Sequence, residues 1–199
     1  MNTRQIRTSI RQQRRSLSLN LQRNHQLSVL KHLKQSGLLK RHKRFAIYLH
    51  GDGELHTDII IKTLLTMKKQ VFLPVLYPYA KNQLWFYPYK ADTKLVKNRF
   101  NIDEPPISGK SITPCYLDVV LMPLVGFDSK GNRIGMGGGF YDRTFSLTKR
   151  YLKKRSPLLI GLAHDLQQCT NIKHQPWDVR LDGVITEKKV MKFTKAFNT

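Results

Sequence analysis

The chain has 199 residues, of which 40% are hydrophobic, as expected for one globular domain with a core of its own. Its two cysteines, Cys115 and Cys169, lie far apart and form no CxxC pair, which argues against a disulfide framework and a cysteine-based zinc site. No stretch reaches the roughly 18 consecutive apolar residues of a membrane helix, and the N-terminus lacks the apolar segment of a signal peptide. We therefore expect a cytoplasmic protein without a membrane partner.

The net charge of the chain is +22, because 35 Lys and Arg oppose 13 Asp and Glu, and residues 1–44 contain no acidic residue. A surface of this kind attracts polyanions, so a basic nucleic-acid-binding module is one hypothesis. The alternatives are a solvated helix surface and a field that attracts small anionic ligands such as nucleotides. Charge alone does not choose among these.

The first predicted elements are helical. Apolar residues recur at helical spacing through residues 3–36, with a break near residues 16–18, and Gly37 is suited to end the second helix. A β-α-β unit then follows, with strands at 44–50 and 70–77 around a helix at 57–69 that Thr57 can cap.

The second half alternates in the same way. Residues 83–89 predict a further strand, and 97–115 form an irregular, proline-containing connection. The apolar run 117–128 is typical of a strand covered on both faces. After it we predict a helix at 140–154, with Tyr141, Phe145, Thr148 and Leu152 near one face, and strands at 156–164 and 181–186.

Strands that alternate with helices predict an α/β fold, here a single three-layer α/β/α domain over residues 1–199 with a mainly parallel, Rossmann-like sheet. No repeat or linker divides the chain. Ligands of such folds bind beyond the C-terminal ends of the strands. The glycine-rich stretch 135–139 and Glu54 both follow a predicted strand, so both are expected at this edge.

The glycine-rich stretch has four glycines among five residues, directly before a predicted helix. Glycine permits positive φ and lets backbone N–H groups approach a ligand, and a helix N-terminus adds partial positive charge, so we predict a phosphate cradle rather than an ordinary flexible loop. Two common phosphate motifs do not fit. Phe140 stands where the GxGxxG fingerprint needs Gly or Ala, and Glu104 stands where a Walker A loop around SGKS, residues 108–111, needs Gly.

Charged residues flank this stretch. Arg133 precedes it and is suited to pair with phosphate charge. Asp142 follows it, either as a first-turn carboxylate that the helix dipole stabilises or as a ligand of a hard cation beside the phosphates. A second carboxylate for such a cation would come from elsewhere in the chain, and the downstream candidates are Asp165, Asp178 and Asp182.

Glu54 also has two interpretations. It is either a solvated turn carboxylate or the acceptor for a heterocycle that presents adjacent N–H donors. The seven histidines show no HExxH or other ligand spacing, and no GxSxG nucleophile elbow is present.

The stretch PLVGFDSKGNRIGMGGGFYDRTF, residues 123–145, resembles the signature of the 5-formyltetrahydrofolate cyclo-ligases, also called methenyltetrahydrofolate synthetases. Six other segments match this family in its order and spacing, so the resemblance covers nearly the whole chain: residues 4–18, 49–57, 71–76, 98–105, 161–167 and 176–186.

The resemblance implies an enzyme that uses ATP and Mg²⁺ to convert 5-formyltetrahydrofolate to 5,10-methenyltetrahydrofolate, releasing ADP and phosphate. The γ-phosphoryl group would move to the formyl oxygen, and N10 would then attack the formyl carbon. The resemblance implies small-molecule partners only, and we expect a monomer. Part of the basic N-terminus would face the triphosphate and a polyglutamylated folate tail.

The resemblance also assigns site residues. Arg133 and Tyr141 would be catalytic, with Tyr141 close to the formyl group. The ATP site would comprise Arg4, Arg7, Arg133, Gly135, Met136, Gly137, Gly138, Gly139 and Tyr141. The folate site would comprise Leu49, Glu54, Phe100, Gly137, Gly138, Gly139, Phe140 and Tyr141, with a core position as the alternative for Phe100. Asp142 and Asp178 would hold the Mg²⁺ ion.

One position departs from the family pattern. The N-terminal ATP contact of the family is a Lys followed four residues later by an Arg, and the helices of residues 1–40 would supply it. Arg7 fits the second position, but Thr3 stands at the first. The neighbouring Arg4 could substitute, although Arg and Lys differ in geometry.

Overall fold

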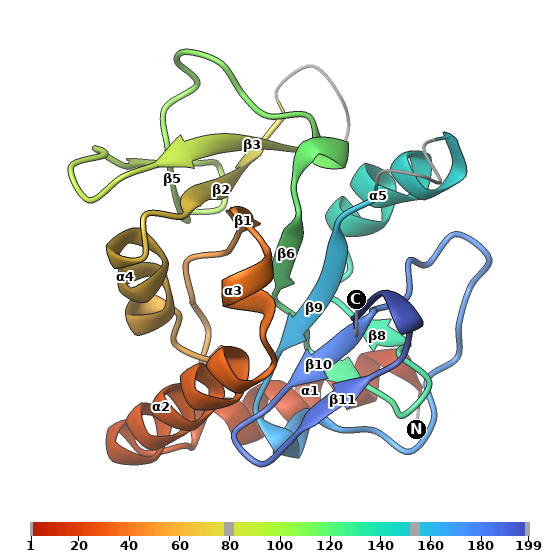
Figure 1. Cartoon of the computed structure of the whole chain (residues 1–199). Coiled ribbons are helices and arrows are strands. Elements are labelled where there is room, and N and C mark those ends of the chain that lie inside the picture. Colours follow the sequence, from red (N-terminus) through yellow and green to blue (C-terminus); the bar gives the residue numbers. More distant parts are fainter. Residues whose placement is uncertain (1, 78–81, 152–155, 198–199) are drawn as a thin grey trace.

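The computed structural model describes residues 2–77, 82–151 and 156–197, without the side chains of 147–151. Its centre is a seven-stranded sheet with the strand order β11-β10-β9-β6-β1-β2-β3 (Figure 1). The five inner strands pair in parallel, and both edge strands, β3 and β11, run antiparallel to their neighbours. The strands are β1 (Arg44–Ala46), β2 (Gln70–Leu76), β3 (Leu84–Tyr89), β6 (Val119–Met122), β9 (Leu158–Leu162), β10 (Gly183–Ile185) and β11 (Val190–Lys192).

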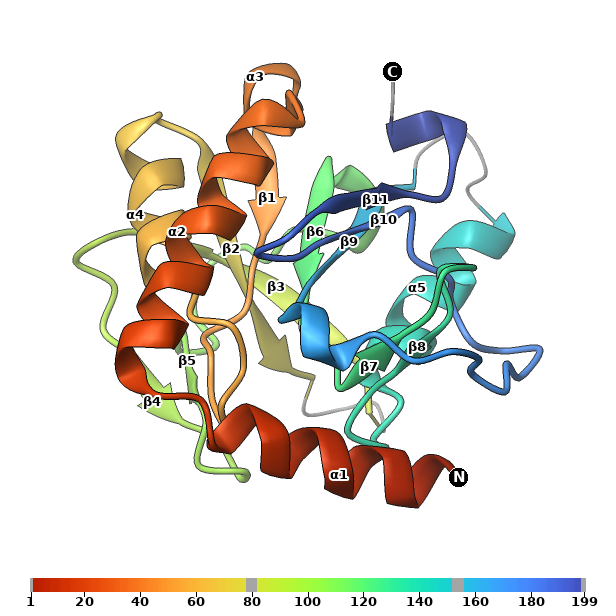
Figure 2. The same cartoon turned by 90° about the horizontal axis from the view of Figure 1, so that it is seen from below.

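Helices cover both faces of the sheet, as predicted. Successive strand residues face opposite sides, so Val119 and Leu121 pack in one core with the helices on one face, whereas Val120 and Met122 pack in a second core with α5. Figure 2 shows this arrangement from below, with the sheet between the two helical layers. The first layer contains α2 (Leu19–Gln35), α3 (Leu38–Arg41) and α4 (Asp58–Thr66), and the second contains α5 (Phe140–Tyr151). This three-layer α/β/α architecture confirms the predicted fold class.

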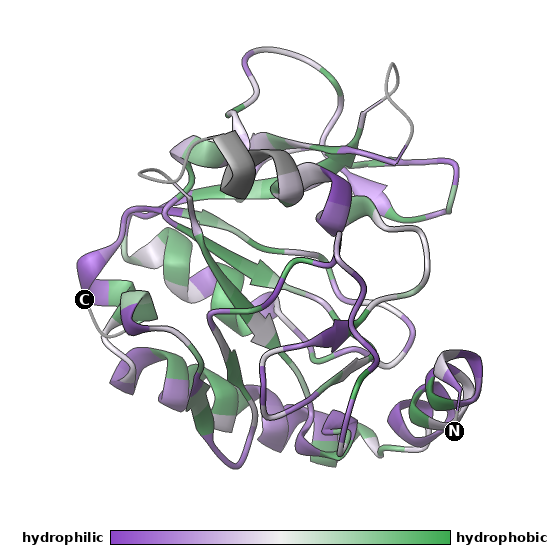
Figure 3. Ribbon diagram, turned by 90° about the vertical axis from the view of Figure 1, so that its right-hand side faces the viewer, coloured by the Kyte–Doolittle hydropathy of each residue, from purple (hydrophilic) through white to green (hydrophobic). Residues whose placement is uncertain are grey.

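The N-terminal helix α1 (Thr3–Arg15) lies apart from both layers. Asn2 begins it with a capping box, since its side chain accepts from the backbone N–H of Gln5 at 2.9 Å and its own N–H donates to the Gln5 side chain. In Figure 3, α1 is mainly hydrophilic with a narrow apolar stripe, while hydrophobic residues gather in the sheet. Ile10 on this stripe packs against Val125, Ile134 and Ile172. The helix therefore packs against residues 125–134 and 166–172, outside both helical layers.

The predicted break and its caps are present. Ser18 begins α2 by accepting from the Leu21 N–H at 3.3 Å, and Gly37 follows α2 with a positive φ of 78°. Thr57 stands at the N-cap position of α4, but its hydroxyl donates to the Tyr48 carbonyl at 2.8 Å and makes no capping bond. The prediction of a Thr57 side-chain cap was therefore wrong.

Two strand predictions need correction, and one strand was not predicted. The apolar run 117–128 is not one strand, because β6 ends before Pro123, which has no N–H for a sheet hydrogen bond. Its remainder enters a small hairpin, in which β7 (Gly126–Phe127) pairs with β8 (Arg133–Ile134). β1 is also shorter than predicted, and the edge strand β11 has only three residues, which is too short for a sequence pattern.

The remaining elements are short. They are β4 (Val96–Lys97), which pairs with β5 (Asp103–Glu104), and the 3₁₀ turns η1 (Pro114–Tyr116), η2 (Asp165–Gln167) and η3 (Lys195–Phe197). Tyr141 and Phe145 of α5 stack on one another with ring centroids 6.3 Å apart, whereas Leu152 lies outside the described residues. No helix among the described ranges combines the length and the hydropathy that crossing a membrane requires.

Candidate active site

Two cavities lie at the C-terminal edge of the sheet, one on each side of the glycine-rich loop. Their volumes are about 540 and 590 Å³. The loop is their common wall, because Arg133, Gly135, Gly139 and Asp142 line both. A molecule in one cavity and a molecule in the other would thus meet across the same few residues.

The first cavity is mainly apolar and reaches into the sheet. Residues just after β1 and within β2 form its floor, including Tyr48, Leu49 and Leu73. Phe100 and Phe140 line another side, with their rings edge to face and their centroids 6.1 Å apart. Such a pocket accommodates a flat, largely uncharged ring.

Glu54 is one of four carboxylic residues that line this cavity, with Asp103, Glu104 and Asp142. It follows the turn after β1, and its Oε2 accepts a hydrogen bond from the Gly51 N–H at 3.2 Å. Burial raises the pKa of the Glu54 carboxyl to about 7, against the opposing influence of the Arg14 guanidinium and the Gly51 N–H. Ionisation of such a carboxyl group becomes more favourable when a ligand brings N–H donors to it.

The C-terminal end of α1 binds the turn that carries Glu54. Arg14 is completely buried, and its Nη2 donates to the Asp52 carbonyl at 2.8 Å and to Asp52 Oδ2 at 3.1 Å. Arg11 and Arg15 also bind the Asp52 carboxylate. Although burial alone would raise it, the hydrogen bonds from Arg11 and Arg15 lower the pKa of Asp52 overall. Part of the basic N-terminal charge therefore holds the Glu54 turn in place.

Two tyrosines line the same cavity. Burial raises the pKa of Tyr141 well above its ordinary range, and the nearby Glu54 carboxyl adds to this rise. Burial has the same effect on Tyr48, whose hydroxyl donates to the Leu55 carbonyl at 3.2 Å. Both hydroxyls therefore stay protonated at neutral pH and can act as hydrogen-bond donors.

The second cavity is polar and basic. Arg7 from α1 lines it and donates from Nε to the Gly135 carbonyl at 2.8 Å, which ties the helix to the glycine loop. Arg143 and Lys173 add positive charge, and the exposed ring of Trp177 supplies a flat apolar surface at the margin. This combination suits an anion that carries a planar group.

Arg133 and Asp142 form the junction between the cavities. Arg133 Nη2 lies 2.7 Å from Asp142 Oδ1, and its Nη1 donates to the Val179 carbonyl. The Val179 N–H also donates to Asp142 Oδ1, at 3.0 Å. The neighbouring Asp178 accepts from the Gln175 N–H at 2.9 Å and lines the second cavity. Two carboxylates and the buried Arg133 guanidinium therefore line the second cavity beside the glycine loop.

Three of the four loop glycines are required by the shape of the loop. Gly137 has a φ of 105° and Gly139 a φ of 67°, which residues with side chains rarely adopt. At Gly138, a Cβ atom would come within 2.6 Å of the Phe140 ring. The Gly138 carbonyl is held by Asn82 Nδ2 at 2.8 Å and Arg143 Nη1 at 2.7 Å. The loop is therefore a fixed structure, contrary to the interpretation as an ordinary flexible loop.

The sequence profile of the 5-formyltetrahydrofolate cyclo-ligase family matches residues 1–187. A protein of Haemophilus influenzae named 5-formyltetrahydrofolate cyclo-ligase is 40% identical over 182 residues, which cover 91% of this chain and 95% of that protein. The chain belongs to the 5-formyltetrahydrofolate cyclo-ligase family. An Escherichia coli protein of the same name is 42% identical over 149 residues, or 74% of this chain and 80% of that protein.

Solved structures agree with this family. The structure of an Aquifex aeolicus 5,10-methenyltetrahydrofolate synthetase superposes with a TM-score of 0.82 at 28% identity, covering 98% of this chain and 94% of that one. A 5,10-methenyltetrahydrofolate synthetase from Mycoplasma pneumoniae shares the fold with a TM-score of 0.72 at 24% identity, covering 94% and 99% of the two chains.

The structure brings nearly all residues assigned by the family resemblance to these two cavities. Leu49, Glu54, Phe100, Met136, Gly138, Phe140 and Tyr141 line the first, while Arg7, Gly137 and Asp178 line the second. Phe100 is 53% exposed, so it is not a core residue. Arg4 lines neither cavity, although Thr3 lines the second.

Of the three candidates for a second carboxylate, Asp178 is the one that lines a cavity beside Asp142. Asp182 is buried and accepts the Leu159 N–H at 2.9 Å, and Asp165 pairs with Lys188 at 3.1 Å. Sequence reasoning missed the group formed by Asp52 and Arg14. No local pattern reveals it, because its members lie 38 residues apart.

Proposed function

We propose that this chain converts 5-formyltetrahydrofolate to 5,10-methenyltetrahydrofolate in a reaction that consumes ATP, requires Mg²⁺ and releases ADP and phosphate. The observation that carries this proposal is the glycine loop with a different cavity on each side. A mainly apolar cavity that contains the buried carboxyl group of Glu54 suits a pterin ring, and a basic cavity with two aspartates suits a triphosphate with its metal. Family membership supports the same reaction.

The chemistry explains why the cavities must share a wall. The formyl oxygen is a poor leaving group, so it first attacks the γ-phosphorus of ATP, and ADP departs with the electron pair of the broken P–O bond. The N10 amine then attacks the formyl carbon and loses its proton, and inorganic phosphate leaves as the ring closes. The protein has to align the formyl oxygen with the phosphorus and to stabilise the charge that moves.

On the folate side, ionised Glu54 would accept paired N–H donors of the pterin, with Leu49 lining the ring pocket. Phe100 and Phe140 would pack beside the folate. Tyr141 keeps its proton and would lie close to the reacting formyl group, where in the second step it would donate a hydrogen bond to the oxygen that leaves with the phosphate.

On the phosphate side, Arg7 and Arg133 would neutralise the triphosphate, and N–H groups of residues 135–139 would approach its oxygens. We keep Arg4 as a further candidate contact, because Thr3 offers no positive charge at the neighbouring position. Asp142 and Asp178 would hold Mg²⁺, since one or two carboxylates with phosphates and waters are its usual ligands. When bound with the nucleotide, the ion would offset negative charge on the phosphates.

The test is to mix the purified full-length chain with 5-formyltetrahydrofolate and MgATP and to follow the absorbance of the methenyl product. We expect product in proportion to ADP, and none when ATP is omitted or Mg²⁺ is chelated. An Asp142→Ala variant provides the matched inactive protein. If the wild-type chain forms no product with active folate and metal present, the proposal is wrong.

A further inference from the structure

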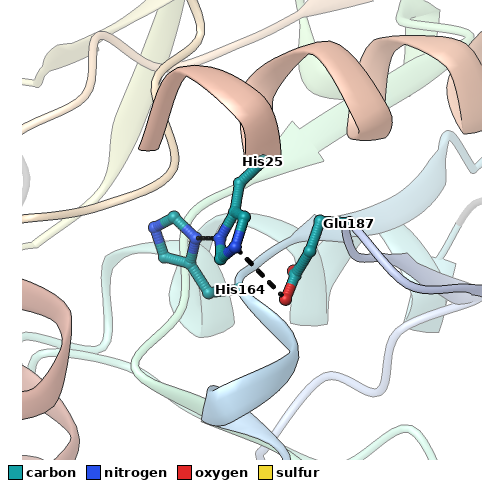
Figure 4. Close-up of side chains that lie close together, drawn as sticks. All are labelled: His25, His164 and Glu187. Atoms are coloured by element: carbon teal, nitrogen blue, oxygen red, sulfur yellow. Dashed lines mark hydrogen bonds and ion pairs between the residues drawn. The ribbon is translucent and has the colours of Figure 1, made fainter. Parts of the chain in front are cut away.

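Three side chains that can bind a metal ion meet away from the two cavities (Figure 4). His25 comes from α2, His164 from the end of the segment that follows β9, and Glu187 from the turn between β10 and β11. His25 Nδ1 lies 2.8 Å from His164 Nδ1, and His25 Nε2 lies 3.8 Å from Glu187 Oε1. One ligand atom from each residue lies within 4.8 Å of the others. The sequence gives no ligand spacing because the two histidines are 139 residues apart.

The three side chains are largely buried, and two of them are slightly exposed to solvent. His164 is completely buried, whereas the side chains of His25 and Glu187 are 13% and 11% exposed. Backbone contacts fix two of the three residues, since Glu187 Oε2 accepts the Asp165 N–H at 2.8 Å and the His164 N–H donates to Gln167 Oε1 at 2.8 Å. The three groups are thus held together before any ion arrives, which lowers the entropy cost of binding one.

The contact between the two imidazoles shows that at least one of them offers a lone pair. A contact between two Nδ1 atoms needs a proton on one ring and a lone pair on the other, so the rings cannot both be cationic. One of the two rings therefore already offers a free lone pair at Nδ1, and the other has to release or move its Nδ1 proton when an ion binds.

Nearby lysines are directed elsewhere. Lys188 and Lys189 belong to the same turn as Glu187, but their ammonium groups lie 3.1 and 3.8 Å from Asp165. Glu187 therefore supplies a negative charge beside the two histidines, despite the strongly positive charge of the whole chain.

We propose that His25, His164 and Glu187 bind one divalent transition-metal ion of the Zn²⁺, Co²⁺ or Ni²⁺ class. Two imidazoles and a carboxylate match the ligand preference of these ions and not that of Mg²⁺, which takes oxygen ligands. With Zn–N distances of about 2.0–2.1 Å, tetrahedral geometry separates two ligand nitrogens by about 3.3 Å, so the two Nδ1 atoms need to part by about 0.5 Å. Glu187 Oε1, which faces Nε2 of His25, would have to turn toward the same ion. Water would complete the coordination.

The ion would stabilise the fold and take no part in the reaction. None of its three ligands lines either cavity. It would join α2 to the segment after β9 and to the β10–β11 turn, which α2 already contacts through His32 Nδ1 and the Thr186 carbonyl at 2.8 Å. We therefore expect metal binding to raise the melting temperature, with turnover independent of it.

The experiment uses the untagged full-length chain, stripped with a chelator and then titrated with ZnCl₂ or CoCl₂. We expect one equivalent by calorimetry, a rise in Tm, and a visible Co²⁺ spectrum typical of nitrogen and oxygen ligands in a low-coordinate site. An excess of Mg²⁺ should not displace the ion. Absence of stoichiometric Zn²⁺ and Co²⁺ binding to the folded wild-type chain would overturn the proposal.

Variants locate the ion. His25→Gln and Glu187→Gln should each weaken Zn²⁺ binding by about 100-fold or more, because each loses one ligand. His56→Gln is the matched control, since it removes one imidazole from the other histidine pair, in which the His50 and His56 rings stack 3.9 Å apart. Wild-type affinity in both ligand variants, or loss of binding in His56→Gln alone, contradicts the assignment. Zn²⁺ binding does not need folate or ATP, so it can succeed even if the proposed reaction fails.

Discussion

The two cavities beside the glycine loop have nearly equal volumes and opposite linings. Among its lining residues the first has Arg133 as its one Arg or Lys, together with several aromatic rings, whereas the second also has Arg7, Arg143 and Lys173. Under the proposed function, the two cavities would therefore select their ligands by charge and not by size. The residues at the junction belong to both sides, so they should differ in kind from residues that line only one.

The difference between the cavities predicts two kinds of mutational effect. A substitution in one cavity should raise the KM of one substrate and leave that of the other unchanged. A substitution at the junction should lower kcat, because the groups there act on the charge that moves between the substrates.

The largest effect is expected for Asp142→Ala at the junction. The variant loses the proposed metal ligand and the ion pair with Arg133, so kcat should fall by about 1000-fold or more. Steady-state assay of the methenyl product gives this value, and circular dichroism checks the fold. Asp92→Ala, at an exposed position that lines neither cavity, is the matched control and should retain full activity. A fully active Asp142→Ala variant would refute the metal assignment.

Glu54→Gln should have the next largest effect, confined to the apolar cavity. Loss of the charge-assisted hydrogen bonds should raise the KM for 5-formyltetrahydrofolate about 100-fold, while the KM for ATP stays constant. An equal rise in both values would show that the two cavities are not separate in function.

The pH profile of kcat/KM for the folate sharpens this prediction. The Glu54 carboxyl of the free enzyme has a pKa of about 7, so its ionised, ligand-accepting form increases as the pH rises from 6 to 8. We expect kcat/KM to rise through this window in the wild type and the rise to be absent in Glu54→Gln. A rise of the same size in the variant would assign the titration to another group.

Arg7→Ala tests the polar cavity alone and should raise the KM for ATP about tenfold. Arg4→Ala should have a smaller effect, because Arg4 lines neither cavity. Thr3→Lys restores the family pattern and should lower the KM for ATP. If Arg4→Ala is as damaging as Arg7→Ala, Arg4 moves into the site when the nucleotide binds.

Asp52→Asn should have the smallest effect on activity. It weakens the binding of Arg14 to the turn that carries Glu54, so the KM for folate should rise about threefold while kcat is retained. The melting temperature should fall as well, because the variant leaves the buried Arg14 charge without its full countercharge. An unchanged Tm and KM would mean that this ion-pair group does not position Glu54.

Much of the fold could be predicted from the sequence because its signals are local. The β-α-β alternation, the glycines before a helix and the break at residues 16–18 each lie within a short window. The hairpin of β7 and β8 was missed because apolar residues continue past Pro123 without a change in pattern. β11 is a strand only through its pairing with β10.

The residues of the candidate site likewise fall into those that local sequence patterns reveal and those that they do not. Glu54, Arg133 and Asp142 could be singled out because each adjoins a predicted strand end or the glycine stretch. The ion pair of Arg14 with Asp52 and the contact of His25 with His164 join segments that are distant in the sequence. Sequence periodicity contains no information about such contacts, so only the folded chain reveals them.

The most direct test of the central claim is a crystal structure of the chain with Mg-ADP and 5-formyltetrahydrofolate. We predict the pterin ring against Glu54 in the apolar cavity and the phosphates beside Arg7 and Asp178 in the polar one, with residues 135–139 between them. Phosphates in the apolar cavity, or both ligands on one side of the loop, would contradict the account.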